Sequence, residues 1–183
     1  MLLVLFWVLS IPAVAAGLAS WRAGRRQLQE LARRAEPPEW TPPVTLIVPV
    51  KGREQGLEEN LRSLAGQDYP DYELLVVARS AEDPAAAELP DRARLVVAGE
   101  GDPHTGEKIH NLLAGVAQAR RSSQVLAFAD SDGRVEPGWL RALVAPLADP
   151  AVGASTGYRW YFPEAGDFWS LLRSSWNATI AGT

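Results

Sequence analysis

The sequence predicts an α/β domain built around a mostly parallel sheet, and three observations lead to this fold class. Short apolar, β-branched runs alternate along the chain with segments of helical periodicity. The run at 44–50 carries no charge until its end, which is typical of a parallel strand buried on both faces. Polar and charged residues directly follow several runs, as expected where open α/β sheets bind ligands beyond the carboxyl ends of their strands.

Each element can be justified from its residues in chain order. Leu57, Leu61 and Leu64 recur at helical spacing after the first strand, and the segment 67–72 breaks that helix. The helix 107–120 carries Ile109, Leu112, Leu113 and Val116 on one apolar stripe, the pattern of a helix that packs against a core. The expected strands are 44–50, 73–78, 94–98, 125–129 and 151–160, and the later helices are 137–147 and 168–176.

Composition limits the classes of function. The chain of 183 residues has room for one domain with a core plus an appendage. Its formal net charge of -4 gives no electrostatic reason to bind a polyanion, so we expect no nucleic acid partner. It contains no cysteine, which excludes disulfides, thiolate nucleophiles and cysteine-zinc sites.

Residues 1–21 predict a transmembrane helix. The first 20 residues carry no charge, and at about 1.5 Å per residue they reach the thickness of a bilayer's hydrocarbon core. Trp21 lies where an interfacial aromatic residue would sit, and arginines follow it. A secretory signal peptide is the alternative, since 13–15 offers a small-residue cleavage site, but its positive charges would precede the apolar run. The positive-inside rule then predicts a membrane protein whose later residues lie on the cytoplasmic side.

The next segment separates this helix from the soluble domain. Residues 22–43 form a linker that is first basic and then rich in proline, and the prolines from Pro37 to Pro43 cannot continue a helix. The domain therefore extends over 44–183.

The most informative motif is Asp130-Ser131-Asp132, which directly follows the apolar run 125–129. Two carboxylates one residue apart at a strand end can direct their oxygens into the same crevice and bind a hard divalent cation beside phosphate oxygens. The same residues also suit a polar β-turn. Their neighbourhood favours the cation site, because the other candidate residues also follow strands.

With these motifs, the chain resembles a family 2 glycosyltransferase of the GT-A fold, a Rossmann-like nucleotide-sugar transferase domain. The resemblance is to the ceramide glucosyltransferase and hopanoid glycosyltransferase branch, including its N-terminal membrane anchor. It rests on the order of several short motifs, at 47–52, 58–64, 67–70, 82–85, 108–112, 130–133 and 157–160.

The resemblance implies a uridine pocket after the first two strands. Pro49 and Val50 would form its wall, and Asp83 would accept a hydrogen bond from the uracil N–H. Glu82 is an alternative to Asp83 in that role. The implied donor is therefore a UDP-sugar.

The resemblance also implies a site for the diphosphate and a metal. Lys51 or Arg53 would be available to phosphate or sugar, although either can be a solvated loop charge. Lys108 lies in the first turn of its helix, where a positive charge opposes the helix dipole and calls for an anion. Asp130 would bind ribose or metal, and Asp132 would hold Mg²⁺ or Mn²⁺ against the diphosphate.

The residues that complete catalysis are not found. An inverting transferase needs a general base, which this family places well beyond the paired aspartates, so we expect it beyond Thr183 and interpret the chain as a fragment. Asp167 is a weak substitute, because a helix N-cap already accounts for it. The apolar helix that follows Asp167 is either a core helix or an interfacial helix that admits a lipid.

Together these observations predict a membrane-anchored, metal-dependent glycosyltransferase that transfers glucose or N-acetylglucosamine from a UDP-sugar to a lipid acceptor at the bilayer. Two alternatives stay open. One is a processive polysaccharide synthase of the same fold, and the other is an inactive fragment that binds a nucleotide sugar.

Overall fold

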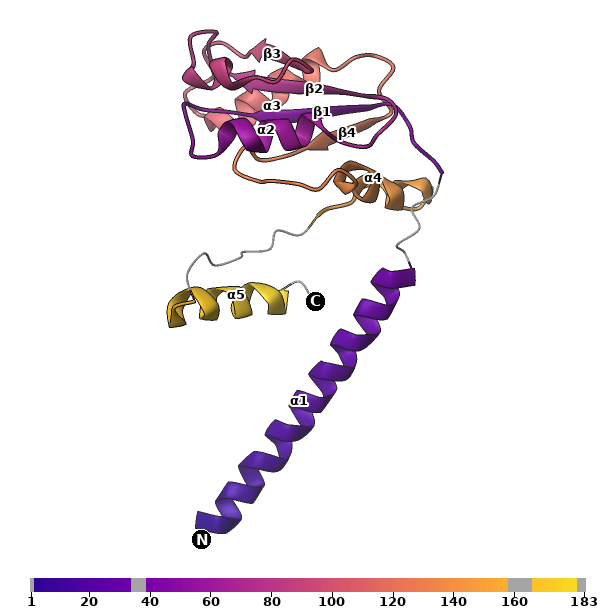
Figure 1. Ribbon diagram of the computed structural model, residues 1–183, viewed down its shortest axis with the longest axis vertical. Helices are drawn as coiled ribbons and strands as arrows, with labels where there is room; N and C mark the ends of the chain where they lie inside the picture. Colours follow the sequence, from indigo (N-terminus) through magenta and orange to yellow (C-terminus); the bar gives the residue numbers. More distant parts are fainter. Residues whose placement is uncertain (1, 34–38, 158–165, 181–183) are drawn as a thin grey trace. The chain divides into compact units, whose positions relative to one another are not determined.

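The computed structural model describes the backbone of residues 2–33, 39–157 and 166–180. The chain divides into two compact units, residues 37–157 and residues 1–36 with 158–183. The first unit contains the sheet and most of the helices (Figure 1). The second contains two helices.

A four-stranded sheet forms the centre of the unit 37–157. Its strands are β1 (Val44–Pro49), β2 (Tyr72–Ala78), β3 (Ala93–Val97) and β4 (Val125–Phe128), and they lie in the order β3-β2-β1-β4. Every adjacent pair is parallel (Figure 1). All residues of β1 are buried, which confirms the prediction from its uncharged sequence. The carboxyl ends of β1 and β4 therefore lie side by side.

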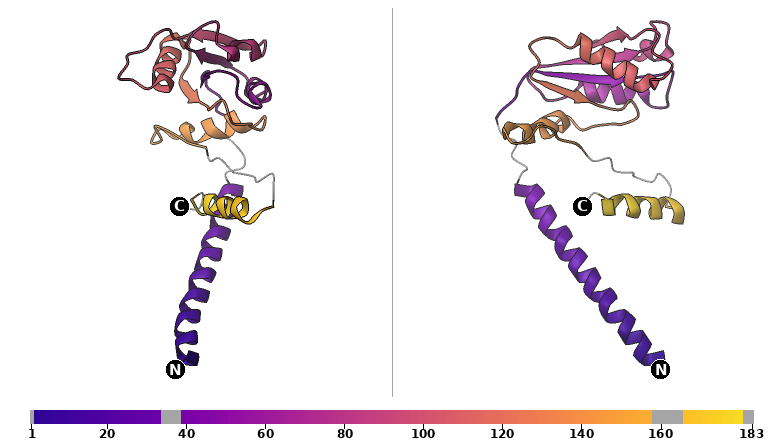
Figure 2. Two further views of the ribbon diagram at one scale, coloured as in Figure 1. Left: turned by 90° about the vertical axis from the view of Figure 1, so that its left-hand side faces the viewer. Right: turned by 180° about the vertical axis from the view of Figure 1, so that it is seen from behind.

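The two faces of this sheet are covered differently. The helix α2 (Leu57–Ala65) and the short helix α4 (Trp139–Val144) pack on one face, where the larger hydrophobic cluster includes Leu46, Leu61 and Leu140. The helix α3 (Glu107–Gln118) lies on the other face, over a smaller cluster. Figure 2 shows α2 and α3 on opposite sides of the strands. The fold is thus a layered α/β domain, as predicted.

The orientation of α3 differs from the predicted one. Its buried residues are Asn111 and Gly115, whereas Leu113 of the apolar stripe is 61% exposed and Ile109 and Val116 are also exposed. The physical reason is close packing at Gly115. A Cβ atom there would lie 2.5 Å from Cγ2 of Ile47, so α3 approaches the sheet through a position without a side chain.

The predicted strand at 151–160 is wrong over residues 152–157, which have no regular secondary structure. In this segment the Ser155 hydroxyl donates a hydrogen bond to the carbonyl of Leu143, so its polar contacts go to α4 rather than to a strand. Residues 158–160 lie outside the described residues. Two short 3₁₀ helices complete the unit, η1 (Pro84–Glu88) and η2 (Ala145–Ala148).

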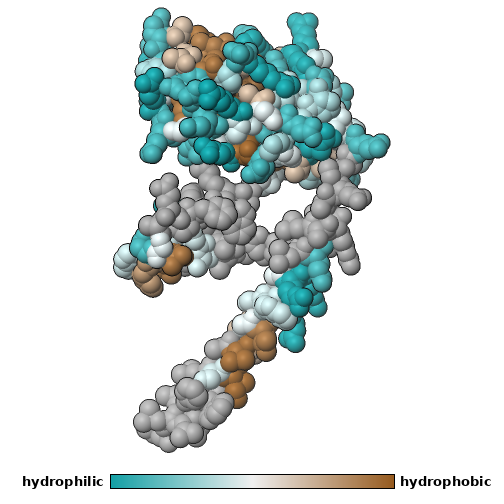
Figure 3. Space-filling view, viewed as in Figure 1, coloured by the Kyte–Doolittle hydropathy of each residue, from teal (hydrophilic) through white to brown (hydrophobic). Residues whose placement is uncertain are grey.

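The second unit holds α1 (Leu2–Arg33) and α5 (Phe168–Ile180). The helix α1 continues well past Trp21, so part of the predicted linker is helical. Figure 3 shows α1 changing from hydrophilic near its C-terminal end to hydrophobic towards its middle. Within the described residues, no helix combines the length and the apolar character that a membrane span requires. The membrane span at residues 1–21 stays a prediction.

Candidate functional site

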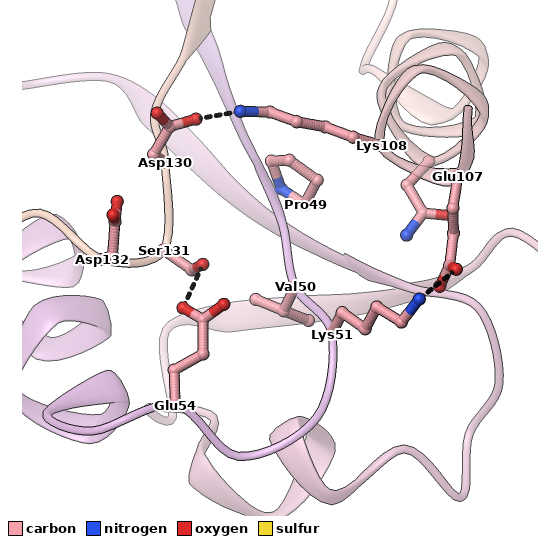
Figure 4. Close-up of a pocket in the computed structure, with 10 residues that line it drawn as sticks. Pro49, Val50, Lys51, Glu54, Glu107, Lys108, Asp130, Ser131 and Asp132 are labelled. Carbon is pink, nitrogen blue, oxygen red and sulfur yellow. Dashed lines mark hydrogen bonds and ion pairs between the residues drawn. The ribbon is translucent and has the colours of Figure 1, made fainter.

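A pocket opens at the carboxyl edge of the sheet, with a volume of about 240 Å³. It lies where β1 and β4 end and α3 begins (Figure 4). Its size is near the low end of ligand cavities, so it accommodates part of a ligand rather than the whole of a large one. The residues that line it are Pro49, Val50, Lys51, Glu54, Glu107, Lys108, Asn111, Asp130, Ser131 and Asp132.

The chain turns sharply after β1 to bring Lys51 to the rim of this pocket. Gly52 adopts a left-handed conformation with φ 65°, which a residue without a Cβ atom accepts at no steric cost. Its N–H donates to Oδ1 of Asp83 at 2.9 Å, and the N–H of Ala85 donates to the same oxygen at 2.9 Å. Asp83 thus caps η1 and fixes the turn beside the pocket, although it is not among the residues that line the pocket.

The turn of the paired aspartates is held by residues that precede or belong to α2. The side-chain amide of Asn60 donates to the carbonyl oxygen of Ser131 at 3.0 Å, and this hydrogen bond is buried. The hydroxyl of Ser131 donates to Oε2 of Glu54 at 2.9 Å. Since Ser131 is buried, these bonds fix the middle of the turn and leave Asp130 and Asp132 exposed at the pocket.

Both lysines of the pocket form ion pairs. Lys51 contacts Glu107 at 2.7 Å, and Lys108 contacts Asp130 at 2.5 Å (Figure 4). The two lysine side chains are 73% and 60% exposed, so each pair contributes little to stability and an incoming anion can replace the carboxylate. Arg53 pairs with Glu88 at 2.9 Å instead and does not line this pocket.

The donor set suits a cation that is shared with a ligand. Within the described residues, no group of three or more histidine, cysteine, aspartate or glutamate side chains could hold a metal ion. The pocket contains the carboxylates of Asp130 and Asp132, one residue apart in the turn after β4, and a cation held by these two would take its remaining ligands from elsewhere. Mg²⁺ at phosphate sites is bound in this way, through one or two carboxylates with the remaining ligands from phosphate and water.

The structure thus brings the predicted residues together in one pocket, with Asp83 beside it. The pocket also contains residues to which sequence reasoning gave no role, namely Glu54, Glu107, Asn111 and Ser131. The sequence could have indicated Asn111 as a pocket residue, because it lies three residues after Lys108 and so on the same side of a helix.

Asp167 is a helix cap in the structure, as predicted. Its Oδ1 accepts hydrogen bonds from the N–H groups of Trp169 and Ser170, at 3.0 and 3.1 Å. The hydroxyl and N–H of Ser170 are the main causes that lower the pKa of the Asp167 carboxyl below its usual range. A carboxylate with a lowered pKa is a weak proton acceptor and hence a poor general base. Capping the helix is therefore a sufficient role for Asp167.

Comparison with known proteins agrees with this geometry. The model of the family described as Glycosyl transferase family 21 matches residues 5–175. The chain belongs to glycosyl transferase family 21. It is 34% identical over 172 residues to the O-antigen biosynthesis protein RfbC of Myxococcus xanthus, which covers 81% of this chain and 13% of that protein.

Solved structures resemble this family 21 chain as well. One is the mannosyltransferase PcManGT from Pyrobaculum calidifontis in complex with GDP-Man and Mn²⁺, at 27% identity and a TM-score of 0.55. The match covers 88% of this chain and 49% of that one. Another is glucosyl-3-phosphoglycerate synthase from Mycobacterium tuberculosis with Mn²⁺, UDP and glucosyl-3-phosphoglycerate, at 23% identity and a TM-score of 0.45, covering 64% and 42% of the two chains. The family 21 chain therefore spans less than half the length of each of these proteins.

Proposed function

We propose that this chain forms the donor-binding part of a glycosyltransferase that transfers a hexose from a UDP-sugar to a lipid acceptor. The observation that carries the proposal is the pocket at the carboxyl edge of the sheet, which brings Asp130 and Asp132 together with two lysines. Membership of glycosyl transferase family 21 supports the reaction class. The choice of glucose or N-acetylglucosamine and of UDP rests on the sequence motifs.

The residues of the pocket suit a metal-bound diphosphate. A divalent cation, Mg²⁺ or Mn²⁺, would stabilise the negative charge of the leaving nucleotide when it is bound. Asp130 and Asp132 would hold it, and Lys51 and Lys108 would exchange their carboxylate partners for phosphate oxygens. The exchange at Lys108 would release the carboxylate of Asp130 to hold the metal.

The transfer reaction forms one bond, breaks another and releases a proton. A bond forms between the acceptor oxygen and the anomeric carbon, and the bond from that carbon to the β-phosphate oxygen breaks, with inversion. The nucleoside diphosphate leaves with the electron pair, and the acceptor's proton goes to a general base. We assign that base to no residue of this chain.

A lipid acceptor and a membrane location on the cytoplasmic side are further parts of the proposal. The resemblance to lipid glycosyltransferases and the apolar, uncharged run at 1–20 support them. In α5, Phe168 is 67% and Trp169 is 74% exposed, as expected of a helix that lies at a bilayer surface.

The donor is tested by calorimetric titration of UDP and of GDP into the full chain, with and without Mn²⁺. GDP is included because PcManGT is a complex with GDP-Man. We expect UDP to bind in the presence of Mn²⁺ and Asp132→Ala to weaken that binding at least tenfold. The matched control is Asp91→Ala, which removes an exposed aspartate from the turn before β3.

Two results would contradict the proposal. Binding of UDP that is indifferent to both Mn²⁺ and Asp132 would place the nucleotide elsewhere. Absence of binding by a sample whose circular dichroism shows a folded α/β domain would remove the donor site altogether. Tighter binding of GDP than of UDP would keep the pocket but change the donor.

A further inference from the structure

The sheet-facing side of α3 carries a polar residue where packing would favour an apolar one. Asn111 and Gly115 are the buried residues of this helix, and they are four positions apart, which places them on the same face. Gly115 lies against Ile47 and Val77 of the sheet. Asn111 lies one turn nearer the start of α3, where that face meets the pocket.

The side chain of Asn111 is incompletely paired. The residue is only 2% exposed, and its Oδ1 has no hydrogen-bond partner. Across the described part of the chain it is the one buried side-chain oxygen or nitrogen in this state. An unpaired buried polar atom destabilises the folded state, so the fold alone gives no reason for an amide here. A reason exists if a bound ligand completes its hydrogen bonds.

The chemistry of the amide restricts what that ligand group can be. Oδ1 only accepts hydrogen bonds, so its partner must carry an O–H or N–H. The oxygens of an ionised diphosphate do not, and the two lysines already provide for them. The amide nitrogen adds a donor next to this acceptor. A nucleoside matches both, since ribose hydroxyls and base edges present donors and acceptors together, and Pro49 and Val50 supply an apolar wall beside them.

We propose that Asn111 is a nucleoside-recognition residue, whose carboxamide hydrogen-bonds the ribose or base of the bound donor at the floor of the pocket. The inference rests on the proposed function and names the residue that distinguishes a nucleotide from free diphosphate. The inference predicts that Asn111 lowers the stability of the fold and raises the affinity for the nucleotide. Replacing the amide with an apolar side chain removes the unpaired atom and stabilises the fold, yet it weakens nucleotide binding.

The test compares Asn111→Leu and Asn111→Ala with the wild-type chain. Calorimetry with Mn²⁺ measures the affinity for UDP, for GDP and for inorganic diphosphate, and thermal unfolding measures stability. We expect about a tenfold loss of affinity for the nucleotide that the wild type binds, the equivalent of one lost hydrogen bond. Affinity for diphosphate should not change, and the melting temperature should rise in at least one variant.

The control makes the same chemical change outside the pocket. Gln118→Leu replaces an exposed amide at the other end of α3 and should change neither affinity. The inference is overturned if both folded variants bind the nucleotide as tightly as the wild type, because water alone would then satisfy Asn111. It is also overturned if nucleotide and diphosphate weaken equally. If the wild type binds no nucleotide, the proposed function has failed, which is a different result.

Discussion

The two edges of the sheet carry polar clusters of opposite character. At the amino edge, Oε1 of Glu73 accepts hydrogen bonds from the hydroxyl of Thr45 at 2.6 Å and from the N–H of Arg120 at 2.7 Å. The Thr45 hydroxyl also contacts that of Ser123 at 2.6 Å, and Arg120 pairs with Asp71 at 2.7 Å. These groups satisfy one another, so the amino-edge cluster holds β1, β2 and the segment before β4 together.

At the carboxyl edge the polar groups surround a pocket. Lys51 and Lys108 reach it in exposed ion pairs that phosphate can replace, and Asn111 keeps a buried oxygen without a partner. The comparison teaches that a polar cluster at a strand end is not in itself a sign of function. The distinguishing property is whether the cluster completes its own hydrogen bonds or leaves them for a ligand.

The largest effect is expected from Gly115→Ala, which would push α3 away from the sheet and disturb both edges. The new Cβ would lie 2.5 Å from Ile47 and 3.0 Å from Val77, two branched side chains that are fully buried in the core. We expect a loss of about 1–3 kcal/mol in the free energy of unfolding, measured by chemical denaturation. Gly153→Ala, where no atom lies within 4 Å of the new Cβ, is the control. Equal stability of the two variants would show that α3 does not pack through Gly115.

Glu73→Gln tests the amino-edge cluster, which should contribute to stability and not to nucleotide binding. Burial would raise the pKa of Glu73, but hydrogen bonds from Thr45, Arg120 and Arg94 outweigh it and hold the pKa below its usual value. The ionised form therefore stabilises the fold above the unfolded-state pKa, and this contribution is lost as the pH falls through the lower folded-state pKa.

We expect Glu73→Gln to cost about 0.5–1.5 kcal/mol at neutral pH and to flatten the loss of stability in acid. Chemical denaturation between pH 7 and pH 3 measures both. Nucleotide affinity should not change, because the amino-edge cluster lies at the far end of the strands. A loss of affinity in the folded variant would break the distinction between the edges.

Lys108→Ala should affect binding instead of folding. The lysine is 60% exposed, so losing its ion pair with Asp130 should change stability by less than about 1 kcal/mol. Losing a cation for the diphosphate should weaken nucleotide binding by about tenfold, as measured by calorimetry. Arg79→Ala breaks an exposed pair with Glu100 outside the pocket and should leave affinity unchanged. If the two variants bind alike, Lys108 has no part in the site.

The smallest effect is expected from Arg62→Ala on the surface of α2. It removes the pair between Arg62 and Glu58 at positions i and i+4, which are 65% and 48% exposed. Such a pair contributes about 0.3–0.5 kcal/mol, so the denaturation midpoint should scarcely move. A larger loss would mean that α2 supports the turn of Asp130 and Asp132 more than its contacts through Asn60 suggest.

The strands and the pocket were predictable because their signals are local. The uncharged run of β1 and the polar residues after each strand indicate a buried parallel sheet and the edge at which its ligands bind. The orientation of α3 was not predictable from its apolar stripe. The close approach at Gly115 turned Asn111 towards the sheet and Leu113 towards solvent, which is a tertiary effect that periodicity does not carry.

The role of Asp83 shows a similar limit. An acid after a strand is consistent both with base recognition and with a helix cap, and only the geometry shows it fixing Gly52 and η1. The strand predicted over 151–160 is wrong over residues 152–157, because a local run of residues does not show whether a neighbouring strand is there to pair with it. Over residues 152–157 the contacts of Ser155 go to α4.

The central claim is that a metal-bound nucleotide occupies the carboxyl edge alone. It is tested most directly by nuclear magnetic resonance of the ¹⁵N-labelled chain with UDP and substoichiometric Mn²⁺, which broadens amide signals steeply with proximity. The six residues of β1 separate the edges by about 20 Å at about 3.3 Å per residue. We predict that Lys51, Lys108 and Asp132 lose their signals while Thr45 and Glu73 keep theirs. Equal broadening at both edges, or broadening at the amino edge first, would contradict the account.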